Sequence, residues 1–81
     1  MKIKVRLNGI LSSQFGWRER EIELPSETTI AGLKKHLEDL ESAVSFESIR
    51  ANSSVNRQVV FDDVILQDGD EVALLPPLAG G

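Results

Sequence analysis

The chain ends in Leu66-Gln67-Asp68-Gly69-Asp70-Glu71-Val72-Ala73-Leu74-Leu75-Pro76-Pro77-Leu78-Ala79-Gly80-Gly81, a segment that combines a turn, a strand and a tail. The Asp-Gly-Asp sequence is a strong turn signal, and we expect residues 71–75 to form the last strand. Pro76 and Pro77 favour an extended, polyproline-like stem, because proline fixes φ and lacks an N–H group. We therefore expect a folded domain at 1–75 and an extended tail at 76–81.

The two terminal glycines, Gly80 and Gly81, are poorly suited to finishing a folded element, because glycine loses the most backbone freedom on ordering. They suit a tail that threads a narrow channel, since no side chain projects from them. Such a tail presents a bare α-carboxylate to a partner. A carboxylate can be activated by adenylation and then exchanged for sulfur or an amine.

The start of the chain predicts two strands. Ile3, Val5 and Leu7 alternate with polar residues, which is the period of a half-buried strand. Residues 22–24 alternate in the same way before Pro25, so we expect a second strand antiparallel to the first.

The middle of the chain predicts one helix, which begins after Thr28 or Thr29 because threonine is a good N-cap. Gly32 within it is expected to cost about 1 kcal/mol relative to alanine. The apolar face recurs at helical spacing and comprises Ile30, Leu33, Leu37 and Leu40.

Beyond the helix we expect a connecting loop at 42–48 and short strands at 50–55 and 58–61 around an Asn56-Arg57 turn. One helix across one face of a mixed sheet is the economical way to bury these apolar stripes, so the fold class is α+β. The first and last strands would then lie side by side and parallel.

Length and composition narrow the range of functions. The 81 residues allow one small domain, and a net charge of −4 argues against nucleic acid as a partner. No apolar run is long enough to cross a membrane and no leader follows Met1, so we expect a cytoplasmic protein. The chain has no cysteine, which excludes disulfides, thiolate metal sites and a cysteine nucleophile. Sulfur could be carried only at the terminus.

The sequence contains no recognisable active site of its own. His36 is the single histidine and has no marked partner, and no spacing gathers metal ligands. Asp62-Asp63 and Asp68/Asp70 are interpreted as turn residues that bond to nearby amides, rather than as paired catalytic carboxylates.

Leu75 is a candidate contact for a partner. If Leu74 faces the core, strand alternation turns Leu75 outward, just before the tail, and an exposed large apolar residue there is a plausible docking point. Val59 and Phe61 are possible neighbours on the same surface. The alternative is that Leu75 packs under the edge of the first strand.

Residues 66–73, followed by the Pro-Pro-x-x-Gly-Gly end, resemble the small subunit of molybdopterin synthase, the MoaD family of ThiS-like sulfur carriers. The opening strand, the helix start at Thr29-Ile30 and the pair Val55-Asn56 match the same layout. The resemblance therefore covers the whole chain and implies a ubiquitin-like β-grasp fold.

The resemblance also implies a mechanism. An E1-like adenylyltransferase of the MoeB type would adenylate Gly81 with ATP, and sulfur would displace AMP to leave a thiocarboxylate. The tail would then enter a MoaE-like large subunit, in a heterotetramer, and deliver sulfur to a pyranopterin precursor. Gly80 would provide clearance for entry into the partner, and Leu75 would pack against the partner. The stalk between them would comprise Pro76, Pro77, Leu78 and Ala79. No bound cofactor or metal is implied, and the catalytic groups would belong to the partner.

Two pairs of residues depart from the family pattern, which usually shows a Phe-Ala pair after the first strand and an Arg-Glu pair in the next segment. This chain has Asn8-Gly9 and Ser12-Ser13 there. Asn8 would lie near Leu75 and make the docking surface more polar, which leaves the partner open. The alternatives are a carrier for thiamine thiazole synthesis or tRNA thiolation, and a ubiquitin-like modifier joined to lysines.

Overall fold

The alternating pattern at the start of the chain is confirmed as a strand in the computed structural model, which describes residues 1–77. Strand β1 (Lys2–Leu7) buries every second side chain and exposes the lysines and the arginine between them. Strand β2 (Glu19–Glu23) runs antiparallel to β1, with Ile22 opposite Ile3. Both isoleucines are buried, so these two strands share one apolar face.

The connection between these strands holds a short helix that the sequence pattern does not predict. Helix α1 (Ile10–Phe15) begins after Gly9 and ends at Gly16, which adopts the left-handed conformation. Leu11 is its one buried residue. A helix this short, with one buried side chain, has no apolar periodicity from which to predict it.

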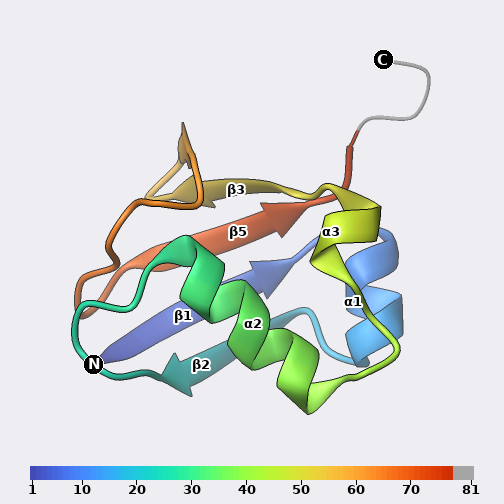
Figure 1. Ribbon diagram of the computed structural model, residues 1–81, viewed down its shortest axis with the longest axis horizontal. Coiled ribbons are helices and arrows are strands. Elements are labelled where there is room, and N and C mark those ends of the chain that lie inside the picture. Colours follow the sequence, from blue (N-terminus) through green and yellow to red (C-terminus); the bar gives the residue numbers. More distant parts are fainter. Residues whose placement is uncertain (78–81) are drawn as a thin grey trace.

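The main helix, α2 (Ile30–Leu40), begins where the sequence predicts, and the side chain of Thr29 accepts a hydrogen bond from the Gly32 N–H group at 3.2 Å. Its residues Ile30, Leu33 and Leu37 are fully buried. The expectation that Leu40 belongs to this buried face is wrong, because Leu40 is 55% exposed. It is the last residue of a helix whose final turn projects past β2 (Figure 1), so no strand lies beneath it.

The predicted loop at 42–48 is also wrong in part, because it contains the start of helix α3 (Phe46–Ile49). The N–H group of Phe46 donates to Glu38 Oε2 at 2.8 Å, and the Ser45 side chain accepts from the Ser48 N–H group. The Phe46 ring is buried. The Ser45 cap is local, whereas the bond to Glu38 and the burial of the ring depend on how α3 packs against α2.

The remaining strands complete a five-stranded sheet in the order β2-β1-β5-β3-β4. Strands β3 (Asn52–Val55) and β4 (Gln58–Val60) form a hairpin around the predicted turn. Strand β5 (Glu71–Leu75) lies in the centre, parallel to β1 and antiparallel to β3. The predicted parallel pairing of the first and last strands is therefore confirmed.

One face of this sheet is covered by α2, as expected for the α+β class (Figure 1). On the other face β1 exposes Lys2, Lys4 and Arg6. Within residues 1–77, none of the helices is long and apolar enough to cross a lipid bilayer. Because β1 and β5 are parallel, both end at the same edge of the fold, near α1 and α3. That edge is where the chain leaves the sheet toward its C-terminus.

Candidate functional site at the base of the tail

The stem of the tail begins where the hydrogen bonds of β5 stop. The N–H group of Asn8, just beyond β1, donates to the carbonyl oxygen of Leu74 at 3.2 Å. Pro76 follows one residue after the end of β5, is half-buried, and has no N–H group with which to continue the ladder. Pro77 is exposed. The sheet therefore ends sharply at Leu75.

Leu75 lies at the base of this stem on the face of the sheet opposite α2. Val72 and Leu74 are buried, and Leu75, on the other side of the strand, is half-buried. It lies opposite Asn52 of β3. On the other side of Leu75 lies the end of β1. Because Leu7 is opposite Leu74, Asn8 lies next to Leu75, as predicted from the sequence. Two asparagines therefore flank Leu75, so its surroundings are polar.

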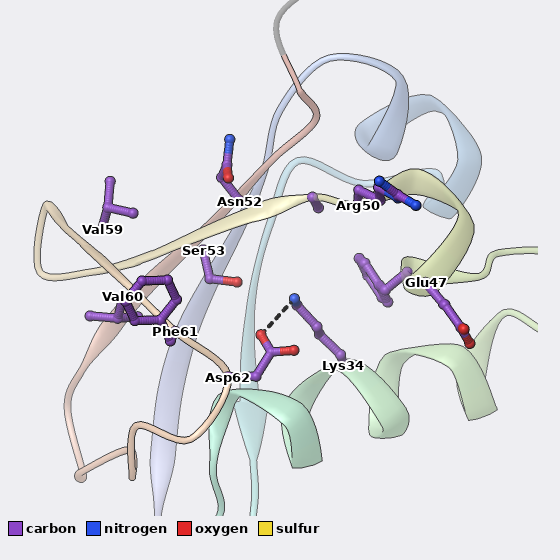
Figure 2. Close-up of a pocket in the computed structure, with 11 residues that line it drawn as sticks. Lys34, Glu47, Arg50, Asn52, Ser53, Val59, Val60, Phe61 and Asp62 are labelled. Carbon is purple, nitrogen blue, oxygen red and sulfur yellow. Dashed lines mark hydrogen bonds and ion pairs between the residues drawn. The ribbon is translucent and has the colours of Figure 1, made fainter.

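Val59 shares this face with Leu75, but β3 separates them. Val59 lies opposite Ser54, which lies opposite Ala73 of β5, and side chains of directly paired residues are on one face. Val59 is 75% exposed and points away from α2 (Figure 2). The structure thus places Val59 and Leu75 on one open surface.

Phe61, which the sequence pattern groups with Leu75 and Val59, lies apart from Leu75, although it lines the same hollow as Val59. It is 84% exposed and follows β4, where it lines a shallow hollow of about 470 Å³ between the β3–β4 hairpin and α2 (Figure 2). In this hollow Lys34 Nζ is 2.8 Å from Asp62 Oδ1. The Ser53 hydroxyl is buried and finds no hydrogen-bond partner within residues 1–77. The carboxylates that line the hollow are Glu47 and Asp62, and neither is hydrogen-bonded to the Ser53 hydroxyl.

The aspartates of the predicted turn are turn residues, as interpreted from the sequence. Asp68 Oδ1 accepts from the Lys2 N–H group at 2.7 Å, and Asp70 Oδ2 accepts from the Gln67 N–H group at 2.8 Å. Their carboxylates are thus used to fix the turn before β5. Among the described residues, no group of three or more histidine, aspartate or glutamate side chains is placed to hold a metal ion.

The predicted sulfur-bearing residue lies beyond the described part of the chain. Leu78, Ala79, Gly80 and Gly81 fall outside residues 1–77, so their predicted roles stay predictions. The described structure reveals a role for Gly9 that the sequence pattern does not predict, because Pro76 lies within 4 Å of the position of a Cβ atom on Gly9. Only the register of β1 against β5 brings these two together.

Comparison with known proteins identifies the family. The model of the ThiS family matches residues 5–81 of this chain. A search of curated proteins found no match.

Similar solved structures cover nearly the whole chain. The putative molybdopterin converting factor subunit 1 from Pyrococcus furiosus is 27% identical, with a TM-score of 0.85 over 96% of this chain and 99% of that one. SAMP1 from Haloferax volcanii is 20% identical, with a TM-score of 0.85 over 100% of both chains. The complex of subunits 1 and 2 of the molybdopterin-converting factor from Helicobacter pylori contains a chain that is 23% identical, with a TM-score of 0.70 over 100% of both chains.

These likenesses agree with the strand order, the parallel central pair and the helix across one face. The fold is the ubiquitin-like β-grasp, as the resemblance at the sequence level implies. With a family match that spans all but the first four residues, this chain belongs to the ThiS family and is a small β-grasp sulfur carrier of the ThiS/MoaD type.

Proposed function

We propose that this protein is the sulfur-donating small subunit of a molybdopterin synthase, and that Gly81 carries the sulfur as a thiocarboxylate. The observation that carries the proposal is the family match, which extends through the diglycine end. The likeness to the Pyrococcus furiosus protein, which is described as a molybdopterin converting factor subunit, favours this pathway over other sulfur pathways.

The chemistry takes place on the terminal carboxylate. A carboxylate oxygen attacks the α-phosphate of ATP, pyrophosphate leaves, and an acyl-adenylate forms. A sulfur nucleophile then attacks the acyl carbon and AMP leaves with the bonding electrons, which gives the thiocarboxylate. An E1-like adenylyltransferase of the MoeB type supplies the catalytic groups, because the described part of the chain offers no nucleophile with an adjacent base.

The second partner is a MoaE-like large subunit, into which the tail delivers its sulfur for transfer to a pyranopterin precursor. The open face around Leu75 and Val59 is the docking surface, since it carries apolar side chains beside the stem. The Helicobacter pylori structure holds a subunit 1 together with a subunit 2, which supports a complex of this kind. By the family resemblance, the assembly is a heterotetramer.

The experiment that tests the carrier chemistry uses the absence of cysteine. The chain is incubated with the adenylyltransferase, ATP and a sulfur donor and is then run on a mercury-containing gel, beside a sample without ATP. Retardation is expected only with ATP, and it must come from the terminus because no thiol is present in the chain. A variant that lacks Gly81 should show none, with an unchanged melting temperature, because the tail adds little to the core.

Absence of ATP-dependent retardation, with an adenylyltransferase shown to be active on another carrier, would contradict the proposal. Branched peptides that end in Gly80-Gly81 on the lysines of other proteins would instead identify a protein modifier.

A second candidate is a carrier for another pathway, which the polar position of Asn8 beside Leu75 favours. The two candidates differ in the partner. Titration calorimetry of the chain against a purified molybdopterin synthase large subunit, a thiazole synthase and a tRNA thiolase from the same organism would distinguish them. Measurable binding to the first alone supports the leading proposal.

A further inference from the structure

Gly9 and Pro76 meet at the edge where β1 and β5 end. The two strands are parallel, with Leu7 opposite Leu74, so the same register continued past the strands brings Gly9 opposite Pro76. A Cβ atom built on Gly9 would lie 3.1 Å from Pro76 Cγ and 3.7 Å from Pro76 Cδ. The proline ring therefore lies on the side of Gly9 from which a side chain would project, and a Cβ atom there would make a tight contact with the ring.

The backbone of Gly9 is also in a conformation that favours glycine. Its φ is 59° and its ψ is −135°, a region that residues with a Cβ atom rarely adopt. The dihedral angles thus favour glycine here, and a Cβ atom would in addition force the Pro76 ring to shift by a few tenths of an ångström.

Gly9 is itself held firmly by helix α1. Both the N–H group and the hydroxyl of Ser12 donate to the Gly9 carbonyl oxygen, at 3.2 Å and 2.8 Å. Leu11, in the first turn of the same helix, is fully buried in the core. The surface on which Pro76 rests is therefore anchored to the sheet through α1.

We propose that Gly9 is a positioning residue for the C-terminal tail. Pro76 comes one residue after the last ladder residue of β5, and its φ is fixed, so the place where its ring rests sets the direction in which the chain leaves the domain. Gly9 provides that place. This inference rests on the proposed function, since it assigns a role to the tail that a partner must receive.

The kinetic test compares Gly9→Ala with Gly16→Ala, using the chain as the varied substrate of the adenylyltransferase. Gly16 is the control because it caps the same helix and has a φ of +84°, but no atom of residues 1–77 lies within 4 Å of its Cβ position. Both variants should melt at a somewhat lower temperature. In Gly9→Ala alone, kcat should fall by about tenfold to a hundredfold with KM nearly unchanged, because the docked tail is misdirected.

The same comparison is repeated in the Pro76→Ala background, which removes the ring. If the contact is the cause, Gly9→Ala should have less than about a threefold effect there, since coupled residues deviate from additivity. A loss of kcat that persists in this background, or that Gly16→Ala reproduces, would overturn the inference.

A structural readout separates this inference from the proposed function. The chain lacks cysteine, so Leu78→Cys gives a single attachment point for a nitroxide label just after the stem. Paramagnetic broadening of amide signals should be confined to one side of the domain in the parent and in Gly16→Ala, and should move to other residues in Gly9→Ala.

A uniform pattern of broadening in the parent, or the same pattern in all three proteins, would refute the positioning role even if sulfur loading succeeds. If loading fails but the pattern moves, only the proposed function is lost.

Discussion

Gly32 lies in the first turn of α2, where glycine is normally a weak choice. Its ideal Cβ position is 2.9 Å from the Thr28 Cγ2 methyl group, which is too close for a real side chain. That methyl group is held in place, because the Thr28 hydroxyl donates to the Pro25 carbonyl oxygen at 2.7 Å and the side chain is β-branched. Glycine at position 32 therefore avoids a clash with the Thr28 methyl group, whose position is fixed by the hydroxyl bond to Pro25.

This contact predicts that the usual gain from replacing a helical glycine is absent here. Gly32→Ala should leave the free energy of unfolding unchanged or lower it. In the Thr28→Ser background, which keeps the hydroxyl and removes the methyl group, the same change should stabilise by about 1 kcal/mol. Urea denaturation of the four proteins measures this. An equal gain in both backgrounds would show that the methyl group moves aside freely.

The turn of the β3–β4 hairpin holds two of the four non-glycine residues with positive φ in the described part of the chain. Asn56 and Arg57 both have positive φ, 50° and 72°, which is the requirement of the tight turns that connect two antiparallel strands. Asn56 has a second role, because its amide group bonds to Asp70 Oδ1 and to the Glu71 N–H group, both at 3.1 Å. The turn is thereby joined to the start of β5.

The two turn residues should respond in opposite ways to glycine. Arg57→Gly relieves the strain of positive φ and should raise the free energy of unfolding by about 1 kcal/mol. Asn56→Gly relieves similar strain but loses both side-chain bonds to the start of β5, so its net effect should be destabilising. Thermal melts of the two single variants provide the comparison. Stabilisation by both would mean that the asparagine bonds contribute nothing.

Elements with a regular period were predictable from the sequence, and short elements held by tertiary contacts were not. β1 and α2 each bury three side chains at the spacing of their structure, so alternation and helical spacing reveal them. α1 and α3 each bury one side chain. Helix α1 depends on the backbone conformations of Gly9 and Gly16. Helix α3 depends on the hydrogen bond that the Phe46 N–H group donates to Glu38, eight residues away, which a short periodic pattern does not predict.

At the scale of the whole molecule, the sheet presents a helix-covered face and an open face, and the stem leaves at one end. The position of Leu75 on the open face was predictable, because alternation along β5 is a local rule. The separation of Phe61 from Leu75 was not, because it depends on how the chain turns after β4. The same holds for Gly9, whose contact with Pro76 arises only when distant strands pair in register.

The open face predicts how the proposed complex should respond to charge. Leu75→Asp should weaken binding to the large subunit at least tenfold, since a central apolar contact commonly contributes about 2 kcal/mol or more. Ile65→Asp is the matched control, because Ile65 is 55% exposed and lies outside the strands of the sheet. Titration calorimetry gives both dissociation constants, and circular dichroism checks that the variants are folded. Equal weakening by the two changes would indicate a general effect of negative charge rather than a contact at Leu75.

The central place of β5 has a mechanical consequence. The stem continues directly from a strand that is bonded to β1 on one side and to β3 on the other. Tension along the tail therefore acts as shear on two ladders whose bonds run across the direction of pull, so they share the load instead of opening one after another. A partner that binds the tail and pulls on it would therefore move the whole domain as a rigid body, without unfolding β5.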